Sequence, residues 1–187
     1  MARLPYADPG AASEPVREAL DALPSLNIFR MVANAETAFR PWLRLGGALL
    51  SSLELDARLR ELAILRVGQL ERAEYEWVQH VPIARSVGAT DAEIAAIERD
   101  DVESEDLDAA TRAVLRFTTQ AVRDVRVSDE ALAEVREQGI SPRQVVELLL
   151  VISYYMGVAR VAESAGIEVD GPLGDQVAAS AQRPPRR

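Results

Sequence analysis

The fold is decided by the stretch LELDARLRELAILRVGQL, residues 53–70. Its apolar residues recur at three- and four-residue spacings and form one stripe on a helix: Leu55, Leu59, Leu62, Ala63, Val67 and Leu70. Strand-like alternation of apolar and polar residues is nearly absent elsewhere in the chain. The sequence therefore predicts an all-α protein with a helix over residues 53–70.

Further segments with helical spacing lie on both sides of this stretch. Helices are predicted over Pro15–Leu23, Asn27–Phe39, Trp42–Leu50, Glu74–Val87, Leu107–Val122 and Ser128–Gln138. The second should stop at the Arg40-Pro41 step, because a residue that precedes proline disfavours the helical conformation. The acidic run from Asp100 to Asp106 predicts a solvated loop.

Two capping boxes mark further helix starts, Thr90-Asp-Ala-Glu93 and Ser141-Pro-Arg-Gln144. The second box opens a helix that should run to about Ala165 and is apolar on all sides. Its uncharged part, between Glu147 and Arg160, is shorter than the roughly 20 residues of a membrane span. We therefore expect a buried core helix and no membrane partner.

A weak internal repeat is also present. Leu55-Asp-Ala57 recurs as Leu107-Asp-Ala109, and the segment that starts at Gly88 resembles the one that starts at Gly139 at nearly the same separation. The pattern predicts two related helical units packed in a single domain over residues 1–170. The small, polar and proline-rich residues 171–187 are expected to form a disordered tail.

Composition excludes several kinds of chemistry. The 187 residues contain no cysteine, which excludes disulfides and thiolate catalysis, and no lysine, which excludes Schiff-base chemistry. The net charge of -9 makes nucleic acid an unfavourable partner. The first ten residues contain no secretion signal, so a cytoplasmic location is expected.

The candidate catalytic residues are Glu61, Glu76 and His80. His80 is the only histidine, and Glu76 lies one turn before it on the same helix face, where the two can hydrogen-bond and burial would raise the Glu76 pKa. Glu61 is flanked by apolar residues and should pair with Arg58, Arg66 or His80. A solvated or structural ion pair is the alternative, and the spacing does not match a two-helix di-metal site, so no metal is expected.

The same residues carry a family resemblance. Glu61-Leu-Ala-Ile-Leu-Arg66, Ala73-Glu-Tyr-Glu-Trp-Val-Gln-His80 and the segment from Ala84 to Gly88 resemble the carboxymuconolactone decarboxylase family. Its superfamily includes the alkylhydroperoxidases of the AhpD type. Asn27–Asn34 is similar to the N-terminal part of that family.

The resemblance implies the fold and a proton relay. The relay glutamate of the peroxidases matches Glu61, their two cysteines match Ala73 and Glu76, and their histidine matches His80. Because both thiols are missing, peroxide reduction by a disulfide cycle is excluded and the chain resembles the cysteine-free branch. The family resemblance also implies an AhpD-like helical bundle that assembles as a trimer or hexamer.

The implied function is cofactor-free acid–base chemistry on a small organic acid or lactone. Decarboxylation, isomerisation and lactone opening are all open, with His80 as proton donor or electrophile, Glu76 tuning it and Glu61 orienting the pair. Phe29 and Trp77 are candidates for the wall of the substrate pocket. The alternative is a non-enzymatic oligomeric helical protein that binds a small ligand or a partner.

Overall fold

The computed structural model describes residues 1–170, which form nine α-helices and no strand. The helices are α1 (Glu14–Asp21), α2 (Asn27–Val32), α3 (Glu36–Ser51), α4 (Ala57–Glu71), α5 (Glu74–Ser86), α6 (Asp91–Glu98), α7 (Ala109–Asp124), α8 (Asp129–Glu137) and α9 (Pro142–Ala165). The predicted all-α fold class is confirmed. The tail predicted for residues 171–187 lies outside the described residues.

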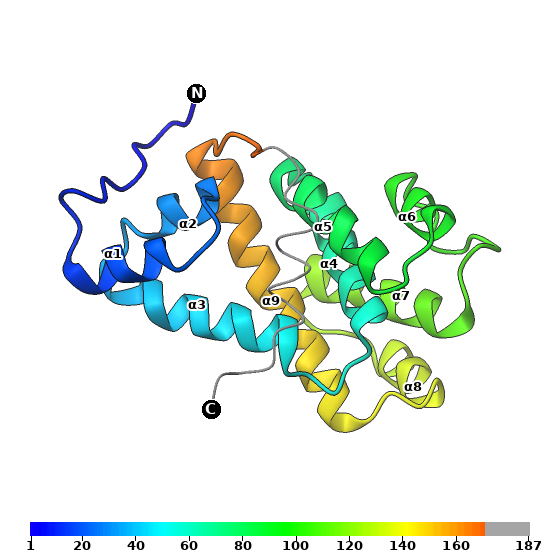
Figure 1. The fold of residues 1–187 in the computed structure, drawn as a ribbon. Coiled ribbons are helices and arrows are strands. Elements are labelled where there is room, and N and C mark those ends of the chain that lie inside the picture. The colour runs from blue at the N-terminus through cyan, green and yellow to red at the C-terminus, as the bar shows by residue number, and fades with distance from the viewer. Residues whose placement is uncertain (171–187) are drawn as a thin grey trace.

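Helix α9 crosses the middle of the molecule (Figure 1). It packs against α2, α3, α4, α5 and α7, with α1–α3 on one side and α4–α8 on the other. Of the described helices, only α9 is long and apolar enough to cross a membrane, and half of its most apolar stretch is buried. These contacts confirm the expected core helix.

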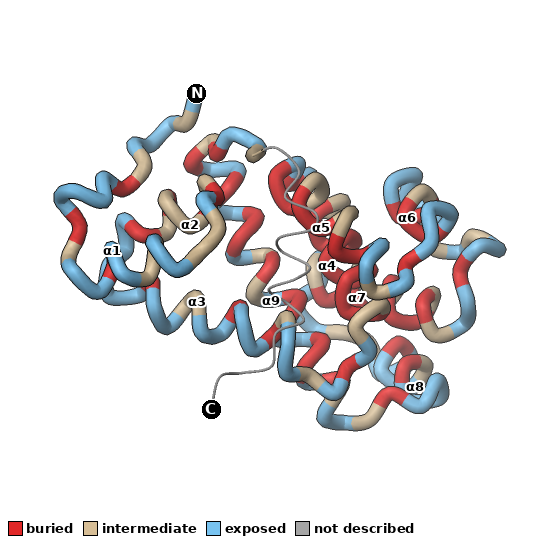
Figure 2. Tube along the Cα trace, viewed as in Figure 1, coloured by how far each residue is buried: buried red, intermediate tan, exposed pale blue. Residues whose placement is uncertain are grey.

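Helix α4 is more deeply buried than one apolar stripe would require. Every residue from Leu59 to Gly68 is buried, because α5, α6, α7 and α9 all pack against it (Figure 2). The buried set includes the charged residues Arg60, Glu61 and Arg66. Charged side chains inside a core need partners, so each of these three residues must be paired or hydrogen-bonded in the interior.

Local capping accounts for the helix starts. The Asp56 side chain caps α4 by accepting from the Leu59 N–H at 3.0 Å, and Asp108 caps α7 in the same way. Both capping boxes, at Thr90 and Ser141, are formed as predicted and begin α6 and α9. The matched caps of α4 with α7 and of α6 with α9 agree with the internal repeat.

The prediction for residues 27–50 was wrong in its boundaries. The chain turns at residues 33–35, where the Asn34 amide donates to the Met31 carbonyl, and α3 then continues through Pro41 and both glycines. Proline has a φ compatible with a helix, but inside one it removes an N–H and its ring crowds the carbonyl four residues earlier, so it weakens or bends the helix without having to end it. Pro41 and Thr37 are exposed, so the Thr37 carbonyl that loses its partner can meet water.

Candidate active site

A tight turn brings α5 back against α4. Arg72 adopts a left-handed conformation with φ of 55°, and the Ala73 N–H donates to the Gly68 carbonyl at 2.8 Å. The two helices pack closely at Gly68, where a Cβ would lie at an ordinary contact distance of 3.6 Å from the Glu76 Cβ. The turn thereby places Glu61 of α4 beside His80 of α5.

Glu61 is fully buried and both of its oxygens are bonded. Its Oε2 lies 2.8 Å from His80 Nδ1, and its Oε1 accepts from Arg60 Nε at 2.9 Å. Because a carboxylate only accepts hydrogen bonds, the proton of the first contact lies on Nδ1. The opposite ring nitrogen, Nε2, then has a free lone pair when the imidazole is neutral.

His80 lies in the wall of a cavity of about 380 Å³ that is partly open to solvent, since the lining residues Ala22, Gly47 and Ser51 are exposed. The edge of its ring faces Tyr155, with centroids 4.8 Å apart and planes at 85°. Nδ1 is held by Glu61, which does not line the cavity, so the ring edge with Nε2 is the one available to a bound molecule. A cavity of this size is typical of small-ligand sites.

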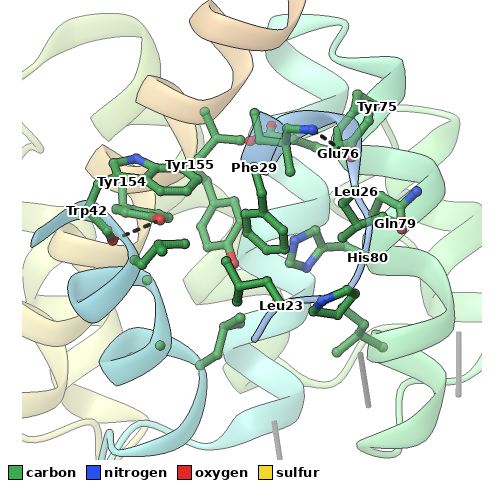
Figure 3. Close-up of a pocket in the computed structure, with 18 of the residues that line it drawn as sticks. Leu23, Leu26, Phe29, Trp42, Tyr75, Glu76, Gln79, His80, Tyr154 and Tyr155 are labelled. Carbon is green, nitrogen blue, oxygen red and sulfur yellow. Dashed lines mark hydrogen bonds between the residues drawn. The ribbon is translucent and has the colours of Figure 1, made fainter. Parts of the chain in front are cut away.

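The cavity lies between the N-terminal helices and the pair α5 and α9 (Figure 3). Most of its wall is aliphatic or aromatic, with polar groups from α5. The lining residues are Ala22, Leu23, Pro24, Leu26, Ile28, Phe29, Trp42, Leu43, Gly46, Gly47, Leu50, Ser51, Tyr75, Glu76, Gln79, His80, Ile83, Tyr154, Tyr155 and Val158.

One end of the cavity depends on Gly46. Tyr154 stacks on Trp42 with ring centroids 5.3 Å apart, and its hydroxyl donates to the Trp42 carbonyl at 3.3 Å. A Cβ at position 46 would lie only 2.3 Å from the Tyr154 hydroxyl. Only glycine at position 46 therefore permits Tyr154 to stack on Trp42. In the sequence, the corresponding signal is a glycine on the face of α3 that packs against α9.

Glu76 is the second buried carboxyl group, at 2% exposure. Within the described residues, neither of its oxygens has a hydrogen-bond partner. Burial, reinforced by the carboxylates of Glu71 and Glu163, raises the pKa of Glu76 to about 9, and the nearby Ala159 backbone opposes this only weakly. Glu76 is therefore a neutral acid at pH 7, as its position on the apolar face predicts.

Hydrogen bonds to Asp170 hold the edge of the cavity together. The Tyr75 hydroxyl donates to the Asp170 carboxylate at 2.6 Å, and the Asn27 N–H donates to the same oxygen at 2.8 Å. Gln79 donates to the Asp170 carbonyl at 3.3 Å. Burial raises the pKa of Tyr75, so its hydroxyl stays protonated at neutral pH.

The structure brings the predicted residues together unevenly. The contact of Glu61 with His80 is present, whereas no hydrogen bond joins Glu76 to His80 in the part of the chain that is described. Arg58 and Arg66 do not pair with Glu61: Arg58 pairs with Glu93 and Asp108, and Arg66 pairs with Asp100. The guanidinium groups of Arg58 and Arg66 form these ion pairs on the side of α4 that faces α6 and α7.

The two predicted pocket residues have different surroundings. Phe29 lines the cavity. Trp77 does not, because it packs against the core cluster of α4 and α6 that contains Leu62 and Ile97. Trp77 is therefore a packing residue, and the prediction for it was wrong.

A comparison with known proteins now bears on the site. The profile of the Carboxymuconolactone decarboxylase family matches residues 36–120, which include Glu61, Glu76 and His80. This segment, a little under half of the chain, is therefore similar to the carboxymuconolactone decarboxylase family. No curated protein sequence matches the chain significantly.

Solved structures share the fold of this chain. An alkylhydroperoxidase AhpD core, an uncharacterized peroxidase-related protein from Ralstonia eutropha JMP134, superimposes with a TM-score of 0.79 at 19% identity, covering 98% of each chain. A peroxidase-related protein from Silicibacter sp. TM1040 gives 0.77 at 17% identity, covering 91% of this chain and 92% of that one. A protein of unknown function from Agrobacterium tumefaciens gives 0.66 at 22% identity, covering 74% and 95%. At these identities the likeness establishes the fold alone.

Proposed function

We propose that this protein, which resembles the carboxymuconolactone decarboxylase family, is a cofactor-independent enzyme that transfers protons on a small molecule bound in the cavity. One observation carries the proposal: Arg60, Glu61 and His80 form a buried chain that ends at the cavity wall. A base oriented by a carboxylate that is itself held in place is the arrangement that general acid–base catalysis needs.

His80 supplies the base. With Nδ1 bound to Glu61, its Nε2 can take a proton from a carbon beside a carbonyl group of the bound molecule. The imidazolium that forms is stabilised by the Glu61 carboxylate at 2.8 Å, and Arg60 keeps that carboxylate in position. Glu61 and Arg60 act through His80 and are positioning residues.

Glu76 supplies the acid. Its pKa of about 9 keeps its proton bound at neutral pH, one turn before His80 on α5. The described residues make no hydrogen bond that would oppose rotation of its side chain toward the cavity. A neutral carboxyl group there can protonate the oxygen or carbon on which negative charge develops.

Several reactions use this pair of groups. Removal of a proton by His80 and its return at another carbon is an isomerisation. When the deprotonated carbon is next to the carbon that bears the ring oxygen of a lactone, a double bond forms between the two carbons, the C–O bond breaks and the ring oxygen leaves as a carboxylate, which opens the lactone. In a decarboxylation, the carbanion left by CO₂ needs only the proton donor. We therefore propose a lyase, isomerase or lactone-processing activity that rests on the same two side chains.

Deuterium incorporation tests the proposal without knowledge of the natural substrate. Wild-type protein in D₂O should accelerate exchange of the protons beside the carbonyl of small ketones and lactones, measured by ¹H NMR. His80→Gln keeps a side chain that can bond Glu61 and should lose about 100-fold or more of that rate. Trp77→Phe, on the same helix but outside the cavity, is the matched control and should retain it.

The alternative of a non-enzymatic binding protein predicts a different result. In that case, compounds would bind without any exchange above the buffer rate, and His80→Gln would only lower stability. Equal exchange rates in wild type and His80→Gln would also contradict the catalytic role of His80.

We also propose that the protein assembles with copies of itself. Apolar side chains on the outer face of α9 support this: Val146, Leu149, Leu150 and Val161 are exposed. Burying such a stripe between copies is favourable. Light scattering should give a mass above that of one chain, and Leu150→Glu should lower it.

A further inference from the structure

The cavity differs from a site for organic acids in its charge. No Arg or Lys is among the lining residues that the structure describes. The nearby arginines of α4 are already paired, Arg60 with Glu61 and Arg66 with Asp100. A carboxylate placed in the cavity would therefore lose its water and find only His80, which is already paired with Glu61, as a possible cation, and this is unfavourable.

The cavity is equally poor in accessible negative charge. Both oxygens of Glu76 are shielded from solvent, and Glu61 lies behind His80. An ammonium group would thus find no exposed carboxylate on the wall. The hydrogen-bonding capacity left to a ligand comes from His80 and from neutral groups such as Ser51 and Gln79.

The remaining surface suits a flat, apolar body. Phe29, Trp42, Tyr154 and Tyr155 all contribute to the wall, and two of them are already stacked on each other. Aromatic side chains favour offset or edge-on contacts with a ring, so they provide orientation as well as burial. The net charge of -9 further opposes the approach of anions.

We infer that the substrate is an uncharged molecule with a ring or compact apolar body and one carbonyl group beside His80, such as a neutral lactone or cyclic or aryl ketone. The inference rests on the proposed function and narrows it, because it sets aside the small organic acid as substrate. A charged competitor would bind more weakly, because its charge would find no free partner of opposite sign in the cavity. This difference in affinity makes the site specific for an uncharged ligand.

A set of three matched probes tests the charge preference: phenylacetone, phenylacetate and phenethylammonium. They share a phenyl ring and a short side arm and differ in charge. Calorimetry on the full chain at pH 7 should show phenylacetone binding at least tenfold more tightly than either ion. Tighter or equal binding of phenylacetate or phenethylammonium would overturn the inference.

A designed variant provides the positive control. Ser51 lines the cavity, is exposed and lies at the C-terminal end of α3, where a positive charge is tolerated. Ser51→Arg should increase the affinity for phenylacetate at least tenfold relative to that for phenylacetone. An unchanged ratio of the two affinities in this variant would contradict the claim that the missing cation sets the preference.

The same probes separate this inference from the proposed function. If phenylacetone is preferred but its deuterium exchange is not lost in His80→Gln, the ligand class stands and the catalytic role falls. If exchange depends on His80 while phenylacetate binds as well as phenylacetone, the catalytic role stands and the ligand class falls.

Discussion

The two sides of His80 contrast sharply. On the α4 side, Glu61 is completely buried and both of its oxygens are bonded, one to His80 and one to Arg60. On the cavity side, Glu76 is almost as deeply buried, yet its oxygens have no partner among the described residues. Paired buried acids are part of a core, whereas an unpaired one lowers stability and is retained for another reason. The contrast therefore supports the proposal that the cavity side is the functional side.

The largest expected effect is on the paired side. Glu61→Ala leaves the Arg60 guanidinium buried without its partner and should lower the free energy of unfolding by about 3 kcal/mol or more. Urea unfolding followed by circular dichroism measures it. Combining Glu61→Gln with Arg60→Met removes both charges and should recover most of the loss. A loss below about 1 kcal/mol in Glu61→Ala would mean that the pair is not a structural element.

The unpaired side should respond in the opposite direction. The pKa of Glu76 rises from 4.5 to about 9 on folding. As far as Glu76 is concerned, the protein therefore keeps its full stability below pH 4.5, where this residue is protonated in both the folded and the unfolded state, and it loses stability as the pH rises toward 9. Glu76→Gln should therefore raise the free energy of unfolding at pH 7 by about 1–3 kcal/mol. The gain should shrink toward zero at pH 4, and a variant less stable than wild type at pH 7 would argue that Glu76 has a partner.

The shape of the cavity side should depend on one glycine. Gly46→Ala drives a methyl group into the Tyr154 hydroxyl, so we expect a loss of about 1–2 kcal/mol and weaker ligand binding. Gly47→Ala is the matched control, because its added methyl group meets nothing within 4 Å and should stabilise α3 by up to about 1 kcal/mol. Thermal melts of both variants measure the difference, and equal melting temperatures would contradict the steric argument.

The smallest effect on stability is expected at Gly68, where α4 packs against α5. Gly68→Ala adds a methyl group at an ordinary contact distance of 3.6 Å from the Glu76 Cβ and improves helix propensity. Stability should increase by about 0.5–1 kcal/mol. Because both sides of His80 keep their contacts, deuterium exchange should be unchanged. A large loss of stability would show that α4 and α5 are packed too closely for alanine.

Local signals made much of the fold predictable. The capping boxes at Thr90 and Ser141 act within a few residues of themselves, so the starts of α6 and α9 could be located from sequence. The helix predicted over residues 53–70 begins only at Ala57, after the Asp56 cap. Helix α3 could not be located from sequence, because Pro41 and the two glycines disfavour a helix locally. Packing of Phe39 and Leu49 in the core overrides that preference.

The site was predictable only where the chemistry of a single residue requires a partner. The pairing of Glu61 with His80 was among the alternatives, since an apolar-flanked acid needs a partner. Arg60 was missed because neighbours in a helix do not face each other, and here its long side chain turns to reach Glu61. Trp42 and Tyr154 meet across more than a hundred positions, which no local pattern encodes.

The position of α9 in the chain bears on how the protein folds during synthesis. Helix α9 supplies cover for α2, α3, α4, α5 and α7, yet it is translated after all of them. At 5–20 residues per second, the preceding residues would take roughly 10–30 s to emerge with their inner faces unprotected. We therefore expect the nascent chain to be prone to aggregation until α9 arrives, and mutations that slow its docking should reduce soluble yield more than they lower the melting temperature of the finished protein.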